Sequence, residues 1–245
     1  MANRVAQDAF NHLIGDLRAT HGDNLASVVL YGSAAAGDHV ELHSDYNLLI
    51  ALHRITPEDL RMSQAPMREW QRLGHPLPVY FTFNELRDAA DVFPIEFHRM
   101  ERARVVLYGT DPFETFSISD KNLRHQTEYE LRSKLIQLRR LYIPASVSAE
   151  KLQDLMSDSL TSFATLFAPV LLLSGMEAPS LKREIVGATV RLLGLDGATF
   201  ERIFALRESN GARSLGEKEA NELFAAYLSQ IERVIEEVDR INVED

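Results

Sequence analysis

The sequence predicts an α+β fold, in which a mixed sheet with flanking helices is followed by an all-α helical-bundle domain. Up to about residue 110, short β-favourable apolar runs alternate with helical patterns. From Ser119 onward, apolar residues recur only at helical spacing, and no convincing strand follows. The turn-forming Gly109 and Asp111-Pro112 separate the two patterns. We therefore predict two domains, residues 1–115 and 116–245.

The chain is predicted to open with a helix and a strand pair. Val5, Phe10, Leu13, Ile14 and Leu17 recur at three- and four-residue intervals, which is typical of an amphipathic helix. Residues 26–31 are short, apolar and β-branched, so they predict a strand that ends at Gly32-Ser33. Residues 34–36 predict a short helix, and residues 46–52 predict the second strand.

A helix, an edge strand and a fourth strand are predicted next. Thr56, followed by a proline and two acids, is typical of a helix start, and this helix should run to about Leu73. The two prolines of residues 76–83 favour a strand that lies at an edge or starts late. Asn84 is expected to cap the next helix, and residues 104–108 predict the fourth strand.

The second half of the chain is predicted to be helical. The first carries an apolar stripe of Leu131, Leu135, Leu138 and Leu141, and the second a stripe of Leu152, Leu155, Leu160, Phe163, Phe167 and Val170. Shorter helices are expected over residues 180–193 and 196–207, and a long one over 215–240. We interpret the stripes as core or subunit interface, which leaves a homodimer open.

Composition limits the classes of function. The chain of 245 residues has no cysteine, which excludes disulfides, thiolate metal sites and a thiol nucleophile. A net charge of −10 opposes non-specific attraction to nucleic acid. The opening residues are charged rather than apolar, and the longest apolar run, residues 166–173, is far shorter than a membrane span of about 20 residues. We expect a cytoplasmic protein without a membrane partner.

One motif carries chemistry: Leu30-Tyr31-Gly32-Ser33, a second glycine at Gly37, and Ser44-Asp45-Tyr46-Asn47 at the start of the second strand. Glycine permits a backbone conformation that lets amides approach a phosphate closely, and a helix N-terminus favours anions. Residues two apart on a strand point to the same face. Asp45 and Asn47 are therefore expected to project together toward the Gly32-Ser33 turn, with Tyr46 pointing away.

This motif resembles the signature of the DNA polymerase β-like nucleotidyltransferase superfamily, and the two-part architecture resembles its bacterial antibiotic- and small-molecule-modifying members. The resemblance implies an NTP as partner, with Gly32, Ser33 and Ser44 as phosphate-binding residues. It also implies Mg²⁺ held by Asp45 and Asn47, which would be the catalytic positions.

The carboxylate set departs from the family pattern. Both positions are aspartates in the family, so Asn47 has lost one ligand charge, and a third carboxylate on the later strand has no counterpart in residues 77–82. Glu85 and Asp88 follow that strand, and Asp38 and Glu41 lie in the hairpin loop; for all four a solvated position is the commoner outcome. One lost transition-state charge contact costs about 3 to 4 kcal/mol, or 10²- to 10³-fold in rate.

Three hypotheses remain open at this stage. The first is a nucleotidyltransferase-fold protein that binds an NTP but transfers nucleotidyl groups poorly or not at all. The second is an active Mg²⁺-dependent enzyme that moves a nucleoside monophosphate to a hydroxyl of a small molecule or a protein. The third is a non-catalytic protein-interaction module. The basic residues Arg132, Lys134, Arg139 and Arg140 either bind phosphate or form a solvated helix face.

Overall fold

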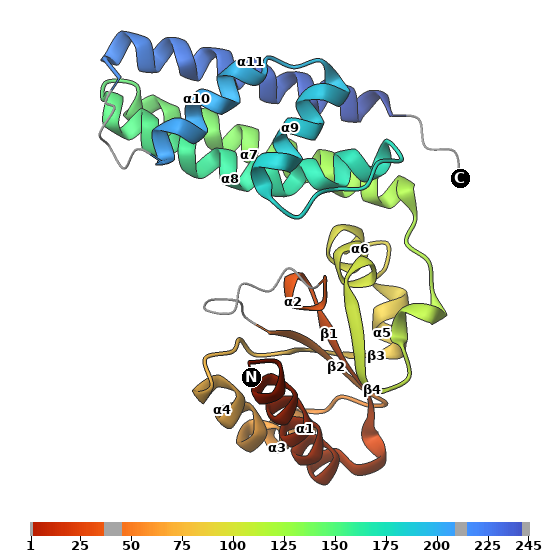
Figure 1. Cartoon of the computed structure of the whole chain (residues 1–245). Coiled ribbons are helices and arrows are strands. Elements are labelled where there is room, and N and C mark those ends of the chain that lie inside the picture. The colour runs from red at the N-terminus through yellow and green to blue at the C-terminus, as the bar shows by residue number, and fades with distance from the viewer. Residues whose placement is uncertain (1, 37–45, 209–214, 242–245) are drawn as a thin grey trace. The chain divides into compact units, whose positions relative to one another are not determined.

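The computed structural model describes residues 2–36, 46–208 and 215–241. The chain forms two compact units, Met1–Ser119 and Asp120–Asp245. Figure 1 shows the helices and strands of both units.

A four-stranded mixed sheet forms the centre of unit 1. Its strands are β1 (Leu25–Tyr31), β2 (Asn47–Leu52), β3 (Val79–Thr82) and β4 (Arg104–Gly109), in the order β3-β2-β1-β4. β1 pairs antiparallel with β2 and β4, whereas β2 and β3 are parallel. The predicted mixed sheet is confirmed. β3 is an edge strand that begins after Pro78, as its prolines predict.

Helices cover both faces of this sheet (Figure 1). One face carries α1 (Ala2–His21), α3 (Pro57–Met62) and α4 (Gln64–Arg72), and the other carries α5 (Phe83–Asp88) and α6 (Pro94–Arg102). The short elements are α2 (Ser33–Ala36), η1 (Gly22–Asn24) and η2 (Pro112–Thr115).

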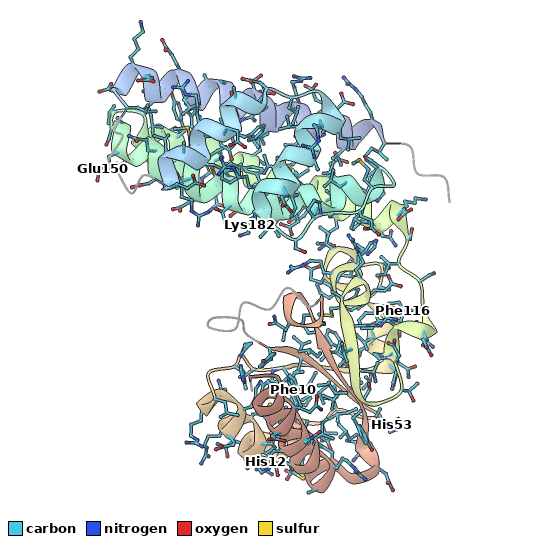
Figure 2. The ribbon with its side chains drawn as sticks, viewed as in Figure 1. Phe10, His12, His53, Phe116, Glu150 and Lys182 are labelled. Carbon is cyan, nitrogen blue, oxygen red and sulfur yellow. The ribbon has the colours of Figure 1, made fainter. Side chains whose placement is uncertain are left out.

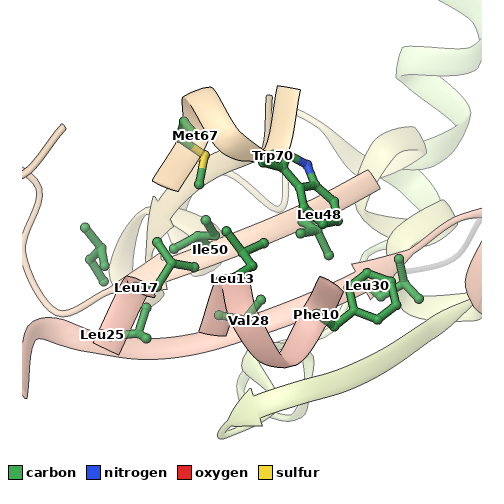
Figure 3. Close-up of a cluster of buried hydrophobic side chains, with 11 residues drawn as sticks. Phe10, Leu13, Leu17, Leu25, Val28, Leu30, Leu48, Ile50, Met67 and Trp70 are labelled. Atoms are coloured by element: carbon green, nitrogen blue, oxygen red, sulfur yellow. The ribbon is translucent and has the colours of Figure 1, made fainter. Parts of the chain in front are cut away.

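The α1 side of the sheet holds the larger core cluster of unit 1. Phe10, Leu13 and Leu17 project from α1 onto apolar side chains of β1 and β2, and Trp70 of α4 closes the cluster (Figure 3). Two residues after the buried Phe10, His12 lies at the surface beside Asp16, so α1 is amphipathic as predicted (Figure 2).

The opposite face uses the alternate residues of the same strands. Val29, Leu49 and Ala51 pack against Leu86 of α5 and Phe97 of α6. Because neighbouring strand residues point to opposite faces, β1 and β2 are buried on both sides and read as nearly continuous apolar runs.

The single helix predicted from Thr56 to Leu73 is wrong: it is divided into α3 and α4 at Ser63. Pro66 explains the break, because a proline has no N–H to donate and its ring clashes with the carbonyl four residues earlier, that of Met62. The break is buried, and the Ser63 hydroxyl contacts the His21 imidazole Nε2 at 2.9 Å. The end of α1 is thereby tied to the α3–α4 junction.

The capping of α5 also differs from the prediction. Thr82, not Asn84, is the cap, because its hydroxyl accepts the Glu85 N–H while the Glu85 carboxylate accepts the Thr82 N–H at 2.7 Å. This reciprocal pair is a capping box. Asn84 lies inside the first turn.

The regular elements among the described residues of unit 2 are all helices, as predicted. It contains α7 (Asp120–Ala145), α8 (Ala149–Leu173), α9 (Lys182–Leu193), α10 (Gly197–Glu208) and α11 (Glu217–Arg240). α8 contacts the other four helices. Within the described residues it is the one helix long and apolar enough to cross a membrane, but half of its apolar window is buried inside the unit, as in a core helix.

The apolar stripe predicted for α7 is correct for Leu131, Leu135 and Leu138, which are buried. It is wrong for Leu141, which is 46% exposed. Position 141 faces the outer groove between α7 and α8, which the rest of the bundle does not fill.

Candidate functional site

The candidate site lies at the end of the sheet where β1 stops and β2 starts. Tyr31, the last residue of β1, pairs with Asn47 on β2 and with Arg104 on β4. Gly32 follows and then α2 begins. Three strands thus bring residues from distant parts of the sequence to one end of the sheet, which is called the site edge below.

Gly32 adopts a left-handed backbone conformation with φ +82. This region is costly for residues that carry a Cβ atom, so the turn needs a glycine. The Gly32 N–H donates to the Ala103 carbonyl at 2.9 Å, and the Gly32 carbonyl accepts the Ala35 N–H at 3.0 Å. The Gly32 and Ala35 N–H groups are therefore both engaged, so the N–H groups that the first turn of α2 can offer an anion are those of Ser33 and Ala34.

Asn47 lies beside this turn. Its side-chain nitrogen Nδ2 is 3.7 Å from the place where a Cβ on Gly32 would stand. Tyr46, one residue earlier, packs on the α1 face, where its ring centroid is 4.9 Å from that of Phe10 and 4.7 Å from that of His75. The alternation predicted from the strand period therefore holds for these two residues.

Several predicted site residues lie wholly or partly outside the part of the chain that the structure describes. Ser44 and Asp45, together with the loop acids Asp38 and Glu41, lie outside the described residues. Ser33 is placed as the first residue of α2, but its side chain is also outside what the structure describes. The roles that the family resemblance implies for these residues stay predictions.

No described residue of β3 supplies the third carboxylate. The parallel register pairs residues 49–52 of β2 with residues 79–82 of β3, none of which is an acid, and the residues just before β3, 76–78, hold no acid either. Leu77 is apolar and 57% exposed. Glu85 is engaged in the α5 capping box, and Asp88 is paired with Arg87 at 3.1 Å.

The described donor set does not fit a two-metal centre. Mg²⁺ prefers several charged oxygen ligands, and at this edge the described side chains of β2 and β3 offer one neutral amide oxygen, that of Asn47. Across the described residues, no group of three histidine, aspartate or glutamate side chains is arranged to hold a metal ion. We therefore derive no step through Mg²⁺.

One arginine, Arg99, brings positive charge to the end of β1, and the sequence alone did not predict it; a second, Arg104, is paired with an acid. Burial raises the pKa of the Tyr31 hydroxyl, and the nearby Arg99 guanidinium partly opposes that rise. Arg104 donates to the Asp111 carboxylate at 2.8 Å and lies over the Phe113 ring. Arg99 and Tyr31 are 68 positions apart, so no local pattern could have joined them.

Comparison with known proteins gives the fold. No family model matches the sequence, and no curated protein matches it either. Among solved structures, the chain is similar to the spectinomycin adenyltransferase AAD(9) from Enterococcus faecialis, with a TM-score of 0.56 and 13% sequence identity, covering 93% of this chain and 98% of that one. The fold is that of a nucleotidyltransferase. The match extends over the mixed sheet and the helical half of the chain, whereas an identity this low carries no information about the reaction.

Proposed function

We propose that this nucleotidyltransferase-fold protein binds an NTP and transfers nucleotidyl groups poorly or not at all. The observation that carries the proposal is the amide side chain of Asn47 beside the Gly32 turn, at a position where the family resemblance implies a metal-binding carboxylate. The acid-free β3 strand supports the same conclusion. A cytoplasmic location, where NTPs are abundant, is part of the proposal.

The chain's own groups account for binding more readily than for transfer. The N-terminal turn of α2 presents N–H groups that favour an anion. Arg99 adds positive charge close to Tyr31 at the same edge. Neither group supplies a base or a metal ligand for an attacking hydroxyl. These contacts would hold a triphosphate without activating an acceptor.

Calorimetric titration with ATP, GTP, CTP and UTP tests this function, each with Mg²⁺ and with a chelator. We expect saturable binding of at least one NTP and no measurable release of pyrophosphate when small-molecule hydroxyl acceptors are added. Rapid pyrophosphate release with any acceptor would contradict a silent site, and failure of every NTP to bind would contradict the proposal as a whole.

A second candidate is active transfer to a small molecule, which one observation favours. The similar solved structure holds ATP and spectinomycin, and the likeness covers nearly the whole of both chains. This candidate predicts that Asp45→Asn abolishes transfer while leaving the melting temperature unchanged. A transfer rate unaffected by that substitution would place the reaction elsewhere.

A further inference from the structure

A small pocket opens between α7 and α8 in unit 2, with a volume of about 200 Å³. Its lining residues recur at three- and four-residue intervals on each helix, so one face of α7 and one face of α8 turn toward it. The pocket is smaller than the roughly 300 to 1,000 Å³ of sites for drug-sized ligands. It suits a molecule with few non-hydrogen atoms.

The floor of the pocket is apolar. Four apolar side chains line it: Leu138 of α7 and Phe163 of α8, which are only 2% and 1% exposed, and the more exposed Leu141 and Leu155. Leu141 is the residue whose exposure contradicts the predicted stripe. A branched aliphatic group placed here would cover apolar surface that water now reaches.

Two opposite charges line the same pocket from opposite helices, Lys134 from α7 and Asp158 from α8. Within the described part of the chain neither side chain forms an ion pair. By contrast, the neighbouring Arg132 and Arg139 of α7 are paired with Glu128 and Glu232. An unpaired cation and an unpaired anion at one pocket match a ligand that carries both charges.

Uncharged polar groups complete the lining, and one of them is held in place. The Ser159 hydroxyl lies 3.2 Å from the hydroxyl of the fully buried Tyr227 and 3.1 Å from the Met156 carbonyl. Ser162 and Gln137 also line the pocket. Ser159 thus ties the polar part of the lining to the buried core of the unit.

We propose that this pocket binds a small amphipathic zwitterion, namely a free α-amino acid with a branched apolar side chain. Lys134 binds its carboxylate, Asp158 binds its ammonium group, and the side chain rests on Leu138 and Phe163. The proposal is independent of nucleotide binding at Gly32, since every residue it uses belongs to α7 or α8.

The test is a calorimetric titration of the full-length protein with leucine. Two matched half-ligands accompany it: 4-methylpentanoate, which lacks the amine, and 3-methylbutylamine, which lacks the carboxylate. We expect saturable binding of leucine and at least about tenfold weaker binding of each half-ligand, because a hydrogen bond to a charged group is worth roughly that factor.

Substitutions locate the site. Lys134→Met and Asp158→Asn should each weaken leucine binding by about tenfold. The matched controls are Lys151→Met and Asp154→Asn, which change exposed residues of α8 outside the pocket. These two variants should bind leucine as tightly as the wild type. Thermal melting of each variant separates lost binding from lost folding.

Three outcomes would overturn the proposal: no saturable leucine binding, binding that survives both pocket substitutions, or a half-ligand that binds as tightly as leucine. The last would show a site for a single charge. None of these results would bear on NTP binding, which is measured separately.

Discussion

Gly32 joins three strands at one residue. It follows β1, it donates its N–H to the residue before β4, and it stands beside the first residue of β2. Its positive φ makes any side chain costly there, so the shape of the turn depends on this one position.

Gly32→Ala should lower NTP affinity by about tenfold or more, because a Cβ at this φ shifts the turn that starts α2. Gly74→Ala is the matched control, since Gly74 has φ +93 in an open turn with no atom within 4 Å of an added Cβ. Both variants carry a similar backbone cost of about 1 to 2 kcal/mol. Equal NTP affinity of the two variants in calorimetry would show that the Gly32 turn does not bind the nucleotide.

His21 makes stability depend on pH. It is buried against Ser63, and burial lowers the pKa of its imidazole, an effect partly opposed by the Asp59 carboxylate. The folded state therefore binds a proton less readily than the unfolded chain, so stability falls as pH drops below about 6.5, the ordinary value, toward the lowered one.

Denaturant unfolding of the wild type and His21→Gln between pH 7 and pH 5 measures this effect. The wild type should lose more stability over this interval than the variant does. His12→Gln, at an exposed position on the same helix, is the control for loss of an imidazole from the surface. Equal slopes for wild type and His21→Gln would refute a contribution from His21.

At the element scale, the start of α5 shows how an acid that follows β3 serves structure alone. Glu85 belongs to the capping box with Thr82, and this explains an acid after β3 without a metal. The sequence Thr82-Phe83-Asn84-Glu85 has the capping-box spacing, so the role of Glu85 could have been predicted from the sequence.

Thr82→Ala should lower the free energy of unfolding by about 1 kcal/mol, because it removes the cap of α5. NTP affinity should stay the same. Thr110→Ala, at an exposed position after β4, is the control and should leave stability unchanged. A large loss of NTP affinity in Thr82→Ala would instead connect the start of α5 to the nucleotide site.

The elements differ in how well the sequence predicts them, and the reasons are physical. Strands β1 and β2 are buried on both faces, so their apolar runs identify them. The break between α3 and α4 follows from Pro66, a local signal that the apolar spacing around it obscured. The exposure of Leu141 depends on which face of α7 other helices cover, and helical spacing alone does not determine that.

Some features of the candidate site can likewise be predicted from the sequence, and others cannot. The placement of Asn47 beside Gly32 follows from strand period and hairpin pairing, which are local. The Ala103 carbonyl that holds the Gly32 amide and the Arg99 charge near Tyr31 come from contacts about 70 positions apart. Such contacts arise from the tertiary fold, so no motif in the hairpin encodes them.

At the scale of the whole molecule, each unit has its own core. Unit 1 buries both faces of its sheet, and α8 of unit 2 is surrounded by four helices of the same unit. We therefore propose that the boundary predicted near residue 115 separates two folding units.

A fragment of residues 116–245 should be helical by circular dichroism and unfold cooperatively, because its buried side chains pack on one another. A matched fragment that starts at residue 131 removes the first turns of α7 with the buried Leu123 and Thr127, and should melt at a lower temperature. A fragment 116–245 without cooperative melting would show that unit 2 depends on unit 1.

We propose that the edge at Gly32 is a nucleotide site that lacks metal-holding charge, because position 47 carries an amide where the family resemblance implies a carboxylate. Calorimetric titration of ATP into the wild type and Asn47→Asp, each with Mg²⁺ and with a chelator, tests it most directly. We predict that Mg²⁺ changes the affinity of the wild type little, whereas Asn47→Asp binds ATP about tenfold more tightly with Mg²⁺ than with chelator. Wild-type binding that already requires Mg²⁺, with no gain from Asn47→Asp, would contradict the claim.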